Sequence, residues 1–103
     1  MFELVWTRGS ESDLQEIFDV AETIREGSGA EILLLIDSSL ELLKQFPHMA
    51  PVFIGPIRRL VIRNARHGLF YSVQGKRLII HAIADLRCDP EDLRRRFRRF
   101  LQS

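Results

Sequence analysis

The sequence predicts an α+β fold of two layers, in which an N-terminal helical hairpin packs on a small, mainly antiparallel sheet and a basic helix ends the chain. Apolar residues recur at helical spacing between residues 14 and 46, while three segments between residues 58 and 83 alternate with the period of a strand. The chain has 103 residues, of which 46% are hydrophobic, so we expect one domain spanning residues 1–103. The expected order of elements is β-α-α-β-β-β-α.

The first expected element is a strand over residues 2–6, where Phe2, Leu4 and Trp6 alternate with other residues. Residues 9 and 10 are expected to end this strand. Ser12, followed three residues later by Gln15, predicts a capping box that opens a helix. Apolar residues then follow at spacings of three and four with acidic residues between them, so this helix is amphipathic and acidic on its outer face.

The second helix is predicted to follow a tight reversal at residues 27–29 and to run to Phe46. Its main apolar stripe consists of Leu33, Ile36, Leu40 and Leu43. Outside that stripe, Leu34, Leu35 and Leu42 add more apolar surface than one contact with a sheet requires.

Residues 47–56 are expected to form a loop that holds neither helix nor strand for long, because they contain three prolines and a glycine. Strands are then predicted over residues 58–63, 69–74 and 78–83. Their short connections favour antiparallel hairpins, since parallel neighbours need a longer crossover. The third strand is apolar on both faces, so we expect it inside the sheet.

The last expected element is a basic helix that begins at Asp89 and Pro90. Asp89 supplies an N-cap, and proline is suited to the first helical position. One stripe of this helix is apolar (Leu93, Phe97, Phe100 and Leu101), and its other faces carry arginines.

Several classes of protein are excluded by composition. The longest apolar run, Ile32–Ile36, is far too short to span a membrane, and the N-terminus lacks the features of an export signal, so we expect the protein in the cytoplasm. Cys88 is the single cysteine, which excludes an internal disulfide and a cysteine zinc cluster. No histidines have the spacing of metal ligands, and we expect neither a metal nor a cofactor.

Charge is divided unequally between the two halves of the chain. Residues 1–57 carry three basic and ten acidic side chains, a net charge of −7. Residues 58–103 carry twelve basic and four acidic side chains, a net charge of +8, and eleven of the twelve are arginines. Because arginine binds phosphate and carboxylate through a planar fork, the second half suggests an acidic macromolecular partner.

Four segments of the second half match the pattern of a known family: residues 57–62 (IRRLVI), 68–73 (GLFYSV), 78–83 (LIIHAI) and 85–90 (DLRCDP). In this order and spacing they resemble the RelE/ParE superfamily of bacterial toxins. The end of the second helix, Leu43–Pro47, is similar to the helical hairpin of the ParE branch. The resemblance covers the whole chain and is closer to ParE than to RelE.

The resemblance implies the toxin of a two-gene plasmid-stabilisation module, held inactive by a cognate antitoxin with an acidic, partly disordered segment. ParE-like members poison DNA gyrase, and RelE-like members cut messenger RNA on the ribosome. We expect a ParE-like toxin that acts by binding its target rather than by hydrolysis. Two alternatives stay open: a ribosome-dependent endoribonuclease, and an inactive relative that serves as an interaction module.

The target-binding candidates are Arg59, Arg63, Arg66 and Arg87. In the ribonuclease alternative the resemblance places Arg63 and Arg87 on the phosphate, and His67, between cations that keep its imidazole neutral, is the candidate base. The tyrosine or histidine that family nucleases often carry near the C-terminus is missing from residues 89–103.

Four further residues bear on the candidate site. Asp85 stands where many relatives have histidine. We expect Tyr71 in the core, His81 on a strand face toward solvent or the antitoxin, and His48 in a loop.

The antitoxin-binding candidates are the extra leucines of the second helix, Leu34, Leu35 and Leu42, together with Arg95 and Arg99 of the basic helix. Five arginines within residues 94–99 exceed what solubility requires, although a solvated helix face explains them equally well. The expected assembly is a homodimer or a toxin-antitoxin hetero-oligomer.

Overall fold

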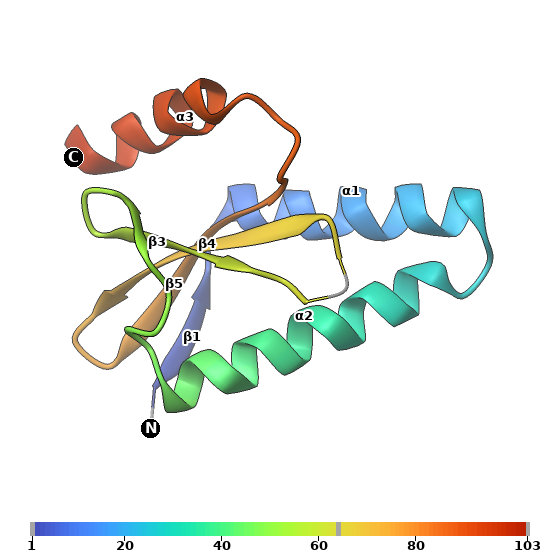
Figure 1. Ribbon diagram of the computed structural model, residues 1–103, viewed down its shortest axis with the longest axis horizontal. Coiled ribbons are helices and arrows are strands. Elements are labelled where there is room, and N and C mark those ends of the chain that lie inside the picture. Colours follow the sequence, from blue (N-terminus) through green and yellow to red (C-terminus); the bar gives the residue numbers. More distant parts are fainter. Residues whose placement is uncertain (1, 64, 103) are drawn as a thin grey trace.

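A computed structural model describes residues 2–63 and 65–102 and has the expected α+β architecture (Figure 1). A five-stranded sheet carries a helical hairpin on one face and the C-terminal helix on the other. The elements are β1 (Glu3–Trp6), α1 (Arg8–Ile24), α2 (Ser28–Gln45), β2 (Val52–Ile54), β3 (Ile57–Val61), β4 (His67–Gln74), β5 (Arg77–Asp85) and α3 (Pro90–Gln102).

The strands are arranged in the order β1-β5-β4-β3-β2. β1 runs parallel to β5, and every other pair of neighbours is antiparallel. β5 therefore has a partner on each side, which confirms its prediction as an interior strand. Strands β2 to β5 follow one another through short connections and pair antiparallel, whereas the helical hairpin carries the chain from β1 to β2 at the opposite edge of the sheet.

The loop predicted over residues 47–56 contains a short strand that the sequence did not reveal. Val52–Ile54 form β2, which pairs with β3 at the edge of the sheet. Pro51 precedes β2, and Gly55, with φ of +53°, turns the chain back into β3. Proline is tolerated at a sheet edge, so the prolines limit β2 to three residues without preventing it.

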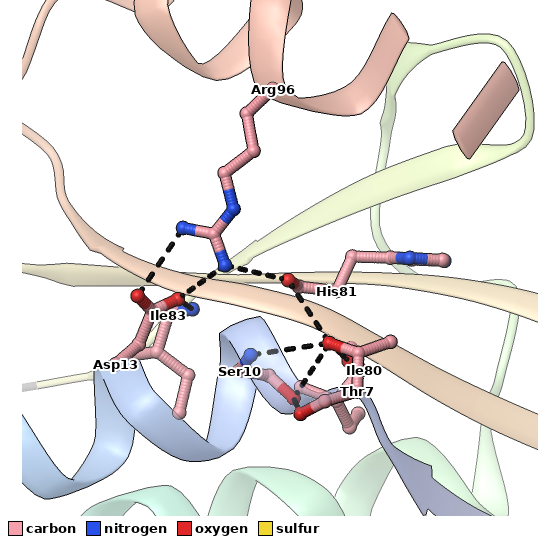
Figure 2. Close-up of polar contacts among 7 residues, drawn as sticks. All are labelled: Thr7, Ser10, Asp13, Ile80, His81, Ile83 and Arg96. Atoms are coloured by element: carbon pink, nitrogen blue, oxygen red, sulfur yellow. Dashed lines mark hydrogen bonds and ion pairs between the residues drawn. The ribbon is translucent and has the colours of Figure 1, made fainter. Parts of the chain in front are cut away.

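The start of α1 differs from the predicted capping box at Ser12. Thr7 is the N-cap: its Oγ1 accepts a hydrogen bond of 3.1 Å from the Ser10 amide, and the Ser10 hydroxyl donates to the Thr7 carbonyl at 2.8 Å. The Thr7 hydroxyl also donates to the Ile80 carbonyl of β5 at 3.0 Å (Figure 2). A cap fixed to the sheet thus starts the helix five residues earlier than its periodicity suggests.

The predicted hairpin between α1 and α2 is confirmed, and glycine is required at two of its positions. Gly27 turns the chain with φ of +89°. Gly29 is buried, and a Cβ there would lie 2.6 Å from the Phe18 ring. Glu22 accepts hydrogen bonds of 3.0 Å from both glycine amides, so the reversal is tied to the end of α1.

The two faces of the sheet form two separate apolar clusters. Leu69 and Tyr71 of β4 face the hairpin, whereas Phe70 between them faces α3. The Tyr71 side chain is fully buried and donates to the Pro47 carbonyl at 2.7 Å, which agrees with its expected place in the core. α3 packs on the second face through Leu93 and Phe97.

A bulge in β5 decides which residues lie beneath α3. Phe70 pairs with Ala82 and Tyr71 pairs with Ile80, so His81 is the extra residue of β5.

None of the helices in residues 2–63 and 65–102 combines the length and the hydropathy that a membrane span requires.

Candidate functional site

A groove of about 780 Å³ lies between the helical hairpin and one end of the sheet. Its apolar wall includes Ile17 of α1 together with Ile32 and Leu35 of α2. The opposite wall is formed by residues at the adjacent ends of β4 and β5, and it is lined by charged and polar side chains. The hairpin also contributes the carboxylates Asp13, Glu16 and Glu31 to the lining, so both sides of the groove are mixed apolar and charged.

Sheet register brings four polar side chains together at this end of the groove. His67, the first residue of β4, pairs with Asp85, the last residue of β5. The Leu86 amide donates to the Arg66 carbonyl at 2.8 Å, which holds the turn before β4 against the segment after β5. Arg66, His67, Asp85 and Arg87 consequently line one end of the groove.

Asp85 and Arg87 form a bidentate ion pair. Arg87 donates from Nε at 3.1 Å and from Nη2 at 2.9 Å, and its backbone amide donates to the same carboxylate at 2.8 Å. These hydrogen bonds hold the pKa of the Asp85 carboxyl well below its usual range, and the partner carboxylate raises the pKa of Arg87. The guanidinium predicted to meet a phosphate is thus already occupied by a carboxylate of the same chain.

His67 is half-buried, and burial is the main reason that its pKa lies below 6.5. Asp85 opposes this effect, while Arg66 and Arg87 reinforce it. The sequence also predicted a neutral imidazole, but it attributed the lowered pKa to the neighbouring cations and not to burial. Its Nδ1 is buried and has no hydrogen-bond partner among the described residues.

The four predicted target-binding arginines do not form one site. Arg66 and Arg87 line the groove. Arg59 lies on the α3 side of the sheet, where its guanidinium is 5.7 Å from the centre of the Phe53 ring. Arg63 is exposed in the turn after β3 and is not part of the groove lining.

His81 does not face solvent as the sequence suggested. It is 6% exposed, its Nε2 shares a hydrogen bond of 2.8 Å with the Ser72 hydroxyl, and its ring lies 4.2 Å from that of Phe100. Burial, followed by the charge of Arg96, lowers its pKa to about 4. The physical reason is that α3 covers the sheet face opposite Ile80, on which strand alternation places His81.

A polar junction that the sequence did not reveal connects α3 to α1 and β5 (Figure 2). Arg96 donates to both Asp13 oxygens at 3.2 and 3.0 Å and to the His81 carbonyl at 3.0 Å. Asp13 also accepts a hydrogen bond of 3.0 Å from the Ile83 amide. Arg96 therefore stabilises the packing of α3, whereas the run of arginines around it in the sequence suggested a side chain exposed on the surface.

The predicted antitoxin-binding residues lie on two opposite sides of the sheet. On α2, Leu34 is 68% exposed and Leu42 is 41% exposed, whereas Leu35 is partly buried and lines the groove. On α3, Arg95 and Arg99 are both exposed, and Arg95 forms an ion pair of 3.2 Å with Asp92. One short segment of a partner could not cover both surfaces.

Carboxylates of the chain itself reduce the positive charge of α3. Glu91 pairs with Arg94 at 2.7 Å and lies 3.9 Å from Arg98. In the described part of the chain, no three metal-ligating side chains lie close enough together to hold a metal ion. Burial raises the pKa of the Cys88 thiol, with a further contribution from Asp85, which disfavours the reactive thiolate.

Comparison with known proteins identifies the family. The family model described as the ParE toxin of the type II toxin-antitoxin system, parDE, matches residues 4–89, from β1 to the residue before α3. Among solved structures, the chain is similar to one from the chromosomal ParDE toxin-antitoxin system of P. aeruginosa, with a TM-score of 0.62 and 22% identity over 82% of this chain and 96% of that one. None of the curated proteins matches the chain. The protein belongs to the ParE toxin family of type II toxin-antitoxin systems.

Proposed function

We propose that this chain is the toxin of a type II toxin-antitoxin pair, that it acts by binding, and that its target is DNA gyrase. A cognate antitoxin holds it inactive in this proposal, and the cytoplasm is its site of action. Membership in the ParE family supports the role as a toxin. The choice of gyrase follows from the resemblance of the sequence to the ParE branch.

The occupation of Arg87 by Asp85 is the observation that carries the binding mechanism. Cleavage of RNA without a metal needs a base, an acid and cations that are free to meet the phosphate. The hydroxyl of Tyr71 and the imidazole of His81 have suitable chemistry, but both are buried in hydrogen bonds with other parts of the chain. These contacts favour recognition over proton transfer.

The ribosome-dependent ribonuclease is the second candidate, because His67 and Arg66 share the groove with Arg87. The two candidates differ in what they require of His67. A gyrase-binding toxin with the His67→Ala substitution should still arrest growth, whereas a ribonuclease that uses this imidazole as its base should lose that effect.

The test is induced expression without antitoxin, with plasmid supercoiling and protein synthesis measured separately. We expect negative supercoiling of the plasmid to be lost before protein synthesis declines, both in the wild type and in the His67→Ala variant. His48→Ala is the matched control, since His48 is exposed and lies outside the groove. Early loss of synthesis that depends on His67 would support the ribonuclease, and normal growth would support an inactive relative.

We also propose that the antitoxin contacts Leu34, Leu35 and Leu42 on one side of the molecule and Arg95 and Arg99 on the other. The exposure of Leu34 and Leu42 supports the first contact, because large apolar side chains in contact with water favour a covering partner. The exposed arginines of α3 suit the acidic side chains of a disordered segment that folds on binding.

A further inference from the structure

The Asp85–Arg87 pair has the form of an anion-binding site whose occupant comes from the same chain. One carboxylate receives two guanidinium hydrogen bonds and one backbone amide hydrogen bond, all from Arg87 and all between 2.8 and 3.1 Å. A guanidinium fork binds two phosphate oxygens in the same way as it binds two carboxylate oxygens. The donors that hold Asp85 are therefore suited to a phosphodiester.

This anion site is open to solvent. The Arg87 side chain is 69% exposed and the Asp85 side chain is 34% exposed. Exposed ion pairs contribute little to stability, so an incoming anion competes with Asp85 for Arg87 at small cost to the fold. The site also lies at one end of the groove, which has a volume of about 780 Å³.

The charges around the site depend on Asp85. Arg66 and Arg87 are cationic, His67 is neutral at neutral pH because its pKa is lowered, and Asp85 is the one carboxylate within this set of four. The set has a net charge of +1 with Asp85 ionised and would have +2 without that charge. Asp85 thus both fills the guanidinium fork and repels a second anion.

We infer that Asp85 acts as a built-in competitor that keeps the phosphodiesters of single-stranded RNA away from Arg87. This inference rests on the proposed function, because it explains how a toxin with a cationic groove end binds a protein target in preference to RNA. Asp85 is then a residue that determines specificity. Neutralising it should create RNA affinity that the wild type lacks.

The experiment measures binding of a labelled single-stranded oligouridine of about 10 nucleotides to the purified chain by fluorescence anisotropy, at about 50 mM salt. We expect Asp85→Asn to bind about tenfold more tightly than the wild type. Asparagine retains an oxygen that accepts the Arg87 amide, which preserves the local backbone.

Asp92→Asn is the matched control. Asp92 pairs with the exposed Arg95 at 3.2 Å, so its neutralisation changes the net charge equally and also frees an arginine, but on α3. We expect this control to stay within about twofold of the wild type. Asp85→Asn combined with Arg87→Gln should return to wild-type affinity, and inorganic phosphate should compete with RNA for the Asp85→Asn variant.

Equal gains in Asp85→Asn and Asp92→Asn would overturn the inference, because net charge alone would then explain both. Retained affinity in the double variant, or no competition by phosphate at constant ionic strength, would also overturn it. Thermal unfolding of each variant verifies that it is folded. The supercoiling measurement on the wild type tests the proposed function without RNA or these variants. A failure of the proposed function can therefore be distinguished from a failure of the inference about Asp85.

Discussion

Individual residues in this protein owe their roles to where the backbone places them, and His81 shows this most directly. Strand alternation puts it on the face of β5 opposite Ile80, which would be exposed if no helix covered it. α3 covers that face with Phe97 and Phe100, and Ser72 supplies the polar partner of the buried ring. Its burial in neutral form links the stability of the fold to pH.

Acidification should destabilise the fold through His81. Its pKa is about 4 in the folded state against 6.5 for an ordinary histidine, so the unfolded chain binds more protons between these values. Stability should therefore be complete above about pH 6.5 and fall by up to about 3 kcal/mol as the pH decreases to about 4. Urea unfolding across this range measures the change.

The control for this prediction is a variant with both His81→Phe and Ser72→Ala, which removes the titrating ring and the hydroxyl that it satisfies. This variant should lose much less stability over the same pH range. Its residual loss reflects His67, whose pKa is lowered in the same direction. An unchanged pH dependence in the double variant would show that His81 is not responsible.

Gly9 and Arg96 should be energetically coupled. A Cβ on Gly9 would lie 2.6 Å from Arg96 Nη2, so Gly9→Ala should push the guanidinium away from Asp13 and cost about 1 kcal/mol of unfolding free energy. In an Arg96→Ala background the same substitution should stabilise α1 by about 0.5 kcal/mol, because alanine is the better helix former. A double-mutant cycle by urea unfolding measures this change of sign.

The sign change is the diagnostic outcome of that cycle, since additive effects would mean that the two residues do not interact. Arg95→Ala serves as the control background. Among residues 2–63 and 65–102 the ion-pair partner of Arg95 is Asp92, and both side chains are about 70% exposed, so the effect of Gly9→Ala should be the same there as in the wild type.

At the scale of elements, α3 is held to the sheet mainly by aromatic packing. The Phe97 ring lies 5.4 Å from that of Phe70 and 6.1 Å from that of Phe53. Arg96 adds the polar junction with α1 and β5, whereas Arg94 and Arg95 pair with carboxylates of α3 itself. α3 should therefore depend on its apolar stripe more than on its arginines.

Removal of the Phe97 ring should loosen α3 selectively. Phe97 is 2% exposed, and a buried phenylalanine replaced by alanine costs about 3 kcal/mol or more. We expect Phe97→Ala to lower stability by that amount and to increase amide hydrogen exchange in α3 first. Phe46→Ala is the control, because Phe46 is 57% exposed and its loss should cost less than about 0.5 kcal/mol.

Periodicity predicted the elements better than their ends. The helical hairpin, the interior position of β5 and the core position of Tyr71 all follow from apolar spacing. The N-cap at Thr7 could not be predicted in this way, because its hydroxyl is fixed by the Ile80 carbonyl of a strand far along the chain. β2 was missed because three residues beside prolines carry no period of their own.

At the scale of the whole molecule, the candidate site was predicted less completely than the fold. Arg66, His67 and Arg87 were singled out from the sequence, and strand register brings them into one groove. The sequence marks Asp85 only as a departure from related sequences, although its carboxylate occupies the guanidinium fork of Arg87. Charge counts along a chain do not show which cations are already paired, and only the tertiary contacts supply that information.

The placement of the antitoxin candidates leads to a prediction about how a partner would cover the molecule. The leucines of α2 and the arginines of α3 lie on opposite sides of the sheet, so an antitoxin that reaches both must wrap around an edge. We expect Leu34→Ala with Leu42→Ala, and separately Arg95→Glu with Arg99→Glu, each to weaken antitoxin binding about tenfold.

Combination of the two pairs tests the wrapping directly. Distant contacts made by one partner should combine independently, so the quadruple variant should weaken binding by about the product of the two effects. Added salt should reduce the effect of the arginine pair, because exposed charges are screened, and should leave that of the leucine pair unchanged. Calorimetry with a purified cognate antitoxin measures both. If the arginine pair has no effect, the antitoxin occupies only the hairpin side, and α3 is left with its structural role and a solvated face.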